Sequence, residues 1–578
     1  MNKKLNTQIL ALVVGLTSVT PTLWGQTTKD DSLSSETVVI VREFEPVIKN
    51  AKKINHQPVI DQVTKKAPNF TYDMVPQNQE YNFNPDTIDA VKIKGEPLNK
   101  LYRAYVKAGM GNYLNNYGQL HINSLRSRDF QWGLNVHHLG SNGGIENRWD
   151  SYMSKQNADL SAKKMLKRHA IHAGFIFDRE QINKYGINRD VLDAPIQDLY
   201  PQNPEQTYMM YKGKAGIQSF ISDSNALNYI VDVNYYNLAI KPYSTVENNV
   251  LITSQFSKDF GTETGYLYFD VDYNKAKSDS LDYKGNILIK PSIDIEFKGD
   301  KWHLMAGFKT AFEKGDETRF YFFPNAEFKF NVVRNLIVPY IGITGNAKRN
   351  SFNTLRNENP FLYEYSELKT SRTSYDAYAG VRGLISSNLS YNLSAGYKQV
   401  KDMVLYTSDQ PVNGLSGNYY YENVYQPIYD TVDVTHVSAQ IGYQRDEKWN
   451  VLWRLNYNNY QTKREAKAWN LPDLTSDLTV RYNLQDKIIA KSSMTFMSSK
   501  YVKTNETNGT EELAYQVYGR KIDPLFDFNL GIEYRFTKKV SAFVDVNNIL
   551  SQNYEIWGNY QVQGINVLGG VTIAFWAK

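Results

Sequence analysis

The sequence predicts an all-β fold, a transmembrane antiparallel β-barrel of about 22 strands. Two observations carry this prediction. From residue 101 to the end of the chain, apolar and polar residues alternate with period two, which in a strand sends the two sets to opposite faces. The alternating segments run to about ten residues or more, which is longer than a typical globular strand and long enough for a tilted membrane crossing. A soluble β-sandwich also alternates, but its strands are shorter.

The first 25 residues have the pattern of a secretory signal peptide. Lys3 and Lys4 form a basic start, residues 9–19 are mostly apolar, and Gly25 is a small residue at a plausible cleavage point. The apolar run is too short for a membrane-spanning helix. We therefore expect export of the chain and removal of residues 1–25.

Composition excludes several classes of protein. The chain has 578 residues and no cysteine, which excludes a lipoprotein anchor, a disulfide framework and any thiolate metal site. Beyond the leader no stretch approaches about 18 consecutive apolar residues, and the mean hydropathy is −0.51, so helical membrane spans are excluded. Basic residues are scattered and balanced by acids, with a net charge of +5, which gives no indication of nucleic-acid binding.

The alternation is clearest in residues 526–536. One face of this segment carries Phe526, Phe528, Leu530, Ile532, Tyr534 and Phe536, and the other carries Asp527, Asn529, Gly531, Glu533 and Arg535. Residues 267–274, 389–398 and 451–458 repeat the pattern. One face suits hydrocarbon and the other suits water, and the tyrosines and tryptophans toward the ends of the apolar rows are typical of interfacial girdles.

Short polar turns supply the strand count. They fall near Arg128, Lys167, Asp223, Asp259, Gly299, Arg334, Ser387, Glu447, Asp486 and Lys538. Two strands and one longer loop, such as 182–206, 350–371 or 504–521, separate consecutive turns, which is the asymmetry of periplasmic turns and outer loops in bacterial outer-membrane barrels. Nine such pairs, with two strands before the first turn and two after the last, give about 22 strands, an even number as such barrels require.

The last strand, predicted over 565–575, carries a recognisable pattern. Its apolar row is Ile565, Val567, Val571, Ile573 and Phe575. Leu568, Gly570, Ile573 and Phe575 resemble the signal by which outer-membrane assembly machinery recognises a terminal strand. An ordinary hydrophobic edge strand is the alternative interpretation.

The segment before the barrel begins with a β-branched run, Glu36-Thr37-Val38-Val39-Ile40-Val41. A signal peptide, this run and a barrel of about 22 strands together resemble the TonB-dependent receptor family. The stretch Val544-Asp545-Val546-Asn547-Asn548-Ile549-Leu550, followed by Asn553-Tyr554-Glu555, is similar to a motif near the end of those barrels. The resemblance implies that residues 36–41 act as a handle, which adds a strand to the edge of an energy-coupling protein.

The sequence departs from that family between handle and barrel. Family members have a plug domain of well over a hundred residues there, whereas residues 49–100 are few, contain five prolines and have no glycine before Gly95. We predict that residues 26–100 form an extended periplasmic region and that residues 101–578 form the barrel. The run that contains Phe44 and Pro46 also resembles the start of plug-less, receptor-like barrels of Bacteroidota outer membranes. Without a plug, the lumen must be closed by inward-folded loops, by residues 27–100 or by a partner.

Motifs of enzymes are absent from the sequence: it has no G-x-S-x-G, H-E-x-x-H, phosphate-binding loop or dinucleotide-binding glycine pattern. His137 and His138 are adjacent on a strand and point to opposite faces, so they cannot share a metal. We predict no catalytic residue, no metal site and no cofactor. Five tyrosines of a predicted outer loop either stack on sugars or cap the aromatic girdle: Tyr419, Tyr420, Tyr421, Tyr425 and Tyr429.

Two functions fit these observations, both in the bacterial outer membrane. In the first, the chain is a receptor-like or transport barrel whose ligand enters through the long outer loops. In the second, it is a non-transporting scaffold subunit of an outer-membrane protein assembly or secretion complex, which docks protein partners through its N-terminal segment. A soluble secreted sugar-binding protein is a third interpretation. The expected partners are outer-membrane lipid and proteins of the outer membrane or periplasm, and no nucleic acid.

Overall fold

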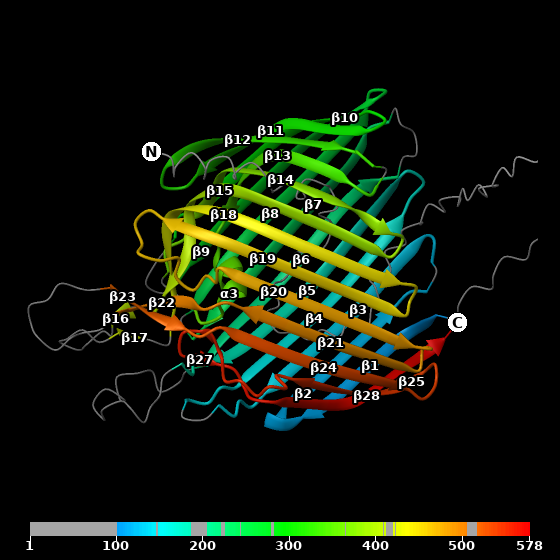
Figure 1. Ribbon diagram of the computed structural model, residues 1–578, viewed down its shortest axis with the longest axis vertical. Coiled ribbons are helices and arrows are strands. Elements are labelled where there is room, and N and C mark those ends of the chain that lie inside the picture. The colour runs from blue at the N-terminus through cyan, green and yellow to red at the C-terminus, as the bar shows by residue number, and fades with distance from the viewer. Residues whose placement is uncertain are drawn as a thin grey trace, which may run out of the picture. The chain divides into compact units, whose positions relative to one another are not determined.

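The computed structural model describes residues 101–577 except for short gaps at 126, 146–147, 187–204, 221–225, 243, 279–282, 334, 364–365, 409, 412–419, 422–423 and 506–516. The predicted leader, extended region and handle lie outside the described residues. Twenty-two antiparallel strands form one sheet that closes on itself through β1 and β28, which confirms the predicted barrel (Figure 1). No helix in the described part of the chain has the length and hydropathy needed to span a membrane.

The barrel strands follow one another in chain order around the wall. They are β1 (Tyr102–Gly111), β2 (Asn116–Asn123), β3 (Phe130–Ser141), β4 (Met153–Met165), β5 (His169–Asn183), β6 (Glu205–Ser219), β7 (Asn228–Lys241), β8 (Thr245–Asp259), β9 (Glu263–Lys277), β10 (Asn286–Lys298), β11 (Trp302–Lys314), β12 (Thr318–Phe330), β13 (Val338–Arg349), β14 (Thr370–Ser386), β15 (Leu389–Thr407), β18 (Gln426–Arg445), β19 (Trp449–Thr462), β20 (Leu474–Leu484), β21 (Ile488–Met497), β24 (Leu525–Arg535), β25 (Val540–Asn547) and β28 (Asn566–Ala577).

The two ends of the barrel differ. Each of the ten predicted turns connects two consecutive strands at one end, called here the turn end, where β1 also begins and β28 also ends. The opposite, loop end carries the smaller elements: η1 (Asn112–Leu114), α3 (Phe352–Glu358), β16 (Gln410–Pro411), β17 (Tyr420–Tyr421), β22 (Lys500–Asn505), β23 (Val517–Ile522), β26 (Glu555–Trp557) and β27 (Tyr560–Gln561). The longer loop predicted over 504–521 lies in the connection between β21 and β24, and β22 and β23 pair within this connection as a separate hairpin.

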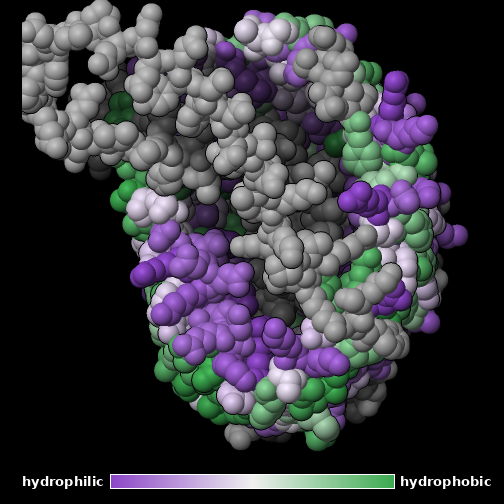
Figure 2. Space-filling view, turned by 90° about the vertical axis from the view of Figure 1, so that its right-hand side faces the viewer, coloured by the Kyte–Doolittle hydropathy of each residue, from purple (hydrophilic) through white to green (hydrophobic). Residues whose placement is uncertain are grey.

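Side chains alternate between a lumen face and an outer face as predicted. On β24, Phe526 is 39% exposed and Ile532 47%, whereas Asp527 is 1% exposed and Glu533 6%. The apolar row faces outward, where lipid replaces water, and the acidic row faces the enclosed interior. Figure 2, which views the turn end, shows hydrophilic residues gathered on part of the rim and hydrophobic residues on the outer wall.

The ladder between β1 and β28 closes the barrel and runs from Tyr102 opposite Ala577 to Gly111 opposite Leu568. Gly570 lies opposite Gly109, and a Cβ on Gly570 would come within 2.1 Å of the carbonyl oxygen of Ala108, so only glycine fits at this close approach. Ile573 and Phe575 belong to the outward row, whereas Leu568 and Gly570 occupy the lumen row. Recognition of these four residues by assembly machinery stays a prediction.

The ladder between β12 and β13 is the shortest in the wall. It covers Ala326 to Lys329 opposite Ile343 to Tyr340, whereas β12 pairs with β11 along its whole length. Pro324 lacks the N–H that would extend the ladder toward the loop end, and β13 has a register shift between Thr344 and Asn346. On the lumen side, the Thr344 hydroxyl donates to the Asn325 side-chain oxygen at 2.9 Å, so side chains hold this seam where the ladder stops.

Candidate functional site

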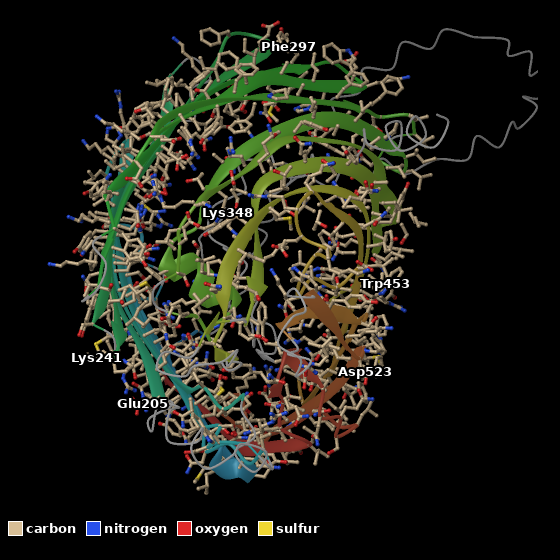
Figure 3. The ribbon with its side chains drawn as sticks, turned by 90° about the vertical axis from the view of Figure 1, so that its left-hand side faces the viewer. Glu205, Lys241, Phe297, Lys348, Trp453 and Asp523 are labelled. Carbon is tan, nitrogen blue, oxygen red and sulfur yellow. The ribbon has the colours of Figure 1, made fainter. Side chains whose placement is uncertain are left out.

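The loop between β13 and β14 folds inward and carries α3 onto the inner wall of the barrel. Residues 350–369 pack there against the described residues of two further loops, 408–425 and 548–565. These three loops are called the loop cap below. Figure 3 looks onto this end of the barrel, where a short helix is visible within the ring of strands.

The start of α3 is fixed both by its own cap and by the wall. The Ser351 hydroxyl accepts from the Thr354 N–H at 3.2 Å, and the Thr354 hydroxyl accepts from the Ser351 N–H at 2.7 Å, which forms a capping box. Glu247 of β8 is fully buried and accepts from the N–H groups of Phe352 at 2.6 Å and Asn353 at 3.3 Å. These bonds satisfy N–H groups of the first turn that have no partner inside the helix.

A buried ion triad holds the other end of the helix. Arg356 is 3% exposed; its Nη2 lies 3.0 Å from Asp178 Oδ1 and its Nη1 lies 3.5 Å from Glu180 Oε2. Both carboxylates belong to β5, and the guanidinium also lies 5.3 Å from the centre of the Tyr208 ring on β6. Removing one partner of such a buried group typically costs about 3–5 kcal/mol, because a charge is left without compensation.

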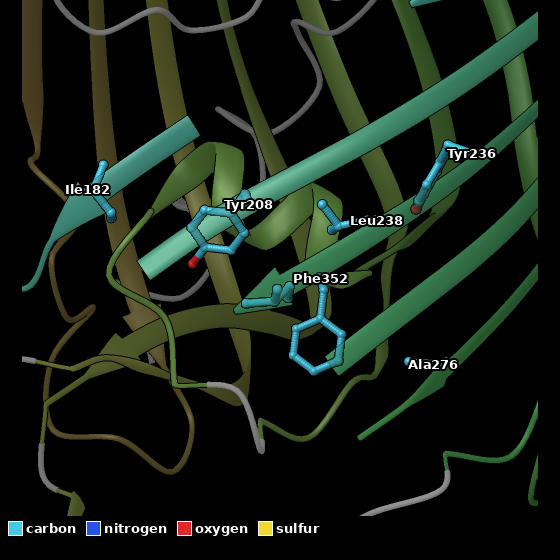
Figure 4. Close-up of a cluster of buried hydrophobic side chains, with 7 residues drawn as sticks. Ile182, Tyr208, Tyr236, Leu238, Ala276 and Phe352 are labelled. Carbon is cyan, nitrogen blue, oxygen red and sulfur yellow. The ribbon is translucent and has the colours of Figure 1, made fainter. Parts of the chain in front are cut away.

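Apolar packing supports the same contact. Phe352 is 1% exposed and lies in a cluster with side chains of β5 to β9 (Figure 4), which are Ile182, Tyr208, Tyr236, Leu238, Ile240 and Ala276. The Tyr208 hydroxyl donates to the carbonyl of Pro360 at 2.7 Å. These wall residues give the lumen face an apolar surface where the loop meets it, so the wall and the loop are complementary.

A second cluster joins the three loops of the cap. It contains Leu355, Leu362, Tyr406, Tyr425 and Tyr560. The Phe361 ring stacks on Tyr560 with centroids 3.5 Å apart, and the Tyr363 N–H donates to the carbonyl of Tyr425 at 2.7 Å. The Tyr425 hydroxyl donates to the carbonyl of Gly558 at 2.8 Å. Ring stacking and main-chain bonds therefore tie segments that are up to about two hundred residues apart in the sequence.

The β22–β23 hairpin braces the cap from the side. Lys500 is 6% exposed; its ammonium group donates to the carbonyl of Ile556 and lies 5.4 Å from the centre of the Trp557 ring. Burial lowers the pKa of Lys500 to about 8, although Glu555 opposes this effect. Arg520 of β23 forms an ion pair with Glu555 at 2.9 Å.

The outer-loop tyrosines that the structure describes with side chains do not stack on sugars or belong to the girdle. Tyr425 is fully buried and Tyr429 is 8% exposed. The Tyr429 hydroxyl donates to the carbonyl of Glu367 at 2.8 Å and accepts from the Lys369 N–H at 3.1 Å. Both earlier interpretations of these two residues are therefore wrong: they hold the loop cap together. Sequence patterning missed this role because a tyrosine in a loop carries no sign of what it packs against.

A cavity of about 680 Å³ lies at the turn end, where residues of the β10–β11 turn, of β11 to β15 and of β18 line it. Its lining contains Lys301, His303, Lys329 and Arg382 together with Tyr391. Lys329 forms an ion pair with Glu327, and a ring nitrogen of His303 lies 2.5 Å from a carboxylate oxygen of Glu296, so the wall already provides partners for these two side chains. The lining also includes apolar side chains such as Trp302, Val338 and Leu384, so the cavity is of mixed polarity.

The remaining predicted site residues fall outside this region. The handle, Glu36, Thr37, Val38, Val39, Ile40, Val41, Phe44 and Pro46, lies outside the described residues, so its role stays a prediction. In the part of the chain that the structure describes, no group of three or more histidine, aspartate or glutamate side chains has the arrangement of a metal site.

Comparison with known proteins rests on structure alone. No family model matches the sequence. No curated protein matches it either. The FrpB iron transporter from Neisseria meningitidis superposes with a TM-score of 0.62 and 10% identity, over 83% of this chain and 82% of that one. The ferripyoverdine receptor of the outer membrane of Pseudomonas aeruginosa, bound to ferripyoverdine, gives a TM-score of 0.61 and 11% identity, over 83% and 72%.

A third solved structure agrees with these two. The copper transporter OprC gives a TM-score of 0.58 and 12% identity, over 82% of this chain and 80% of that one. The chain therefore shares the barrel fold of these three proteins. These neighbours are transporters and receptors, not enzymes, which agrees with the absence of enzyme motifs from the sequence. The closed barrel, its apolar outer wall and this shared fold indicate a location in the bacterial outer membrane.

Proposed function

We propose that this chain is a receptor-type barrel of the outer membrane, in which a ligand enters at the loop end and the loop cap controls access to the lumen. The Arg356 triad is the observation that supports this proposal. The loop that carries α3 and Arg356 can leave the barrel wall as one unit, which gives a docked and a released state. A ligand that binds the released state would shift the equilibrium between these two states. Residues 36–41 would supply the contact with a periplasmic energy-coupling partner, by strand addition.

Single-channel recordings in planar bilayers test the role of the cap. Arg356→Ala leaves Asp178 and Glu180 buried without their counter-charge, so we expect frequent opening steps and a mean conductance at least several-fold above that of the full-length wild type. Arg454→Ala is the matched control, because Arg454 belongs to the polar row of β19 and lies only five residues from the turn-end start of that strand. A folded Arg356→Ala barrel with wild-type conductance would contradict the proposal.

The scaffold function remains the second candidate, and one observation favours it. Leu355, Tyr425 and Tyr560, from the three loops of the cap, are each no more than 1% exposed, which suits a barrel that stays shut. Deletion of residues 27–42 separates the two functions in cells. A coupled receptor loses ligand uptake and remains a free barrel, whereas a scaffold drops out of its complex.

A further inference from the structure

Lysines gather at the loop end of one side of the barrel. Eleven barrel strands run toward the loop end, and only four of them have lysine in the last two positions. These four are consecutive upward strands, β7, β9, β11 and β13, with Lys241, Lys277, Lys314 and Lys348. The other seven end in uncharged residues, which are Gly111, Ser141, Asn183, Thr407, Thr462, Met497 and Asn547. Among the last two positions of the upward strands, lysine is therefore confined to one sector of the rim.

Three of these lysines belong to the outward row of their strands. Lys241 shares the row of Tyr235, which is 47% exposed, and Lys314 directly follows Phe312 in its row, with Phe312 47% exposed. Lys277 lies two positions beyond Lys275 and four beyond Tyr273, which is 41% exposed, and all three lie in the outward row of β9. Each lysine thus extends the lipid-facing aromatic wall toward the loop end.

The aromatic residues below the lysines mark the edge of the hydrocarbon. Phe312 and Phe320 lie with ring centroids 4.7 Å apart, and Phe308 and Phe322 with centroids 5.7 Å apart, all on the outer face of β11 and β12. Aromatic belts lie at the boundary between acyl chains and headgroups. Lys314 lies two positions beyond Phe312, whereas Lys277 and Lys241 lie four and six positions beyond Tyr273 and Tyr235. Lysine side chains on the headgroup side of such a belt can reach lipid phosphates, with their stems along the wall.

Within the described part of the chain, these three lysines differ from other lysines nearby in their lack of an acidic partner. Lys348 is paired with Glu358 at 2.7 Å, and the loop residue Lys284 is paired with Asp316 at 2.7 Å. For Lys241, Lys277 and Lys314, by contrast, the described residues provide no acidic partner within ion-pair distance. Alternate strands are about 10 Å apart, so the three ammonium groups form a row about 20 Å long.

We propose that Lys241, Lys277 and Lys314 form a binding site for a phosphorylated lipid of the outer leaflet. The acyl chains would lie against Tyr273, Phe312 and the neighbouring outward aromatic residues, and the headgroup phosphates would accept hydrogen bonds from the lysine ammonium groups. The site is on the outer wall, separate from the loop cap, and it does not depend on whether the barrel transports a ligand. It would bind one lipid class preferentially, on one side of the barrel.

Native mass spectrometry of the full-length barrel in neutral detergent tests this proposal. Bisphosphorylated lipid A is the probe, and its dephosphorylated form is the ligand control. We expect the wild type to retain the phosphorylated lipid and the triple variant K241Q/K277Q/K314Q to bind it at least ten-fold more weakly. The matched control K487Q/K538Q/K539Q removes three exposed lysines from the turn end and is expected to bind within two-fold of the wild type.

Heat-modifiable migration on gels shows that each variant is a folded barrel before its binding is compared. Equal binding of phosphorylated and dephosphorylated lipid by the wild type would overturn the proposal. So would unchanged lipid binding by the folded triple variant, or full displacement of the lipid by millimolar inorganic phosphate, which would indicate a site for a free anion. Retention of the lipid in the presence of phosphate, with loss only in the triple variant, supports a lipid site.

Discussion

At the scale of single residues, the loop end contains charged side chains that are almost fully buried. Arg356 and Glu247 are both almost fully buried, and each meets a group of opposite charge or a set of N–H donors from another part of the chain. Lys500 differs, because its buried ammonium meets a carbonyl and a ring and has no carboxylate in direct contact among the described residues. Its burial makes the docking of the hairpin sensitive to pH.

The contact of the β22–β23 hairpin with residues 548–565 is expected to tighten as the pH rises from about 8 to about 10.5. In this window the docked lysine has already lost its proton while the undocked lysine keeps it, so the open state binds more protons and stability rises with pH. Each pKa unit is worth about 1.4 kcal/mol, which limits the effect to about 3 kcal/mol. Hydrogen exchange of peptide 555–561, corrected for intrinsic rates, measures this protection.

Lys500→Met should flatten that pH profile, because the methionine has nothing to titrate. Lys503→Met is the control, since Lys503 is paired with Glu465 at 3.1 Å and its removal leaves Lys500 in place. A steep profile that survives in Lys500→Met would assign the effect to another group.

At the scale of elements, β12 is the weakest part of the wall. Only Ala326 to Lys329 pair with β13, so the N–H groups of Thr318 to Asn325 that point toward β13 have no ladder partner. We expect these amides to exchange with solvent at least ten-fold faster than amides of β15, whose ladders with β14 and β18 extend over most of its length. Peptide-resolved hydrogen exchange in detergent micelles measures both segments in one experiment, and equal rates would show that the seam is closed by bonds outside the ladder.

Much of this element structure was predictable from the sequence. The period-two alternation within a strand assigns each side chain to the lumen or the outer face, and the partner strands need not be known. Gly299 and Asp486 belong to residue types that favour turns, so they mark the turns in which they lie. The loop cap was not predictable, because α3 has seven residues and shows no helical periodicity. The capping residues Ser351 and Thr354 are the local indication of a helix start. Nothing in the sequence distinguishes Asp178 from the other acidic residues of the lumen row, since its partner Arg356 lies 178 residues away.

At the scale of the whole molecule, the barrel has one lipid-facing surface and one enclosed surface, and the chain offers a direct test of this division. It has no cysteine, so single cysteines can be introduced without background labelling. We expect Phe526→Cys to react with a membrane-confined maleimide and Asp527→Cys to react only with a water-soluble one, because their side chains are 39% and 1% exposed on opposite faces. Labelling of both positions by the membrane probe would contradict the assignment of the outer wall.

The β1–β28 ladder brings residues from the two extremes of the barrel sequence side by side. Without β28, the facing edges of β1 and β25 would hold unpaired amide and carbonyl groups, which lipid cannot satisfy. A chain that lacks β28 is therefore not expected to close into a barrel, and its exposed strand edges would make it a substrate for chaperones or proteases. Gly109 and Gly570 lie opposite each other in this closing ladder, so a larger residue at either position is expected to impair the step that joins the first and last strands.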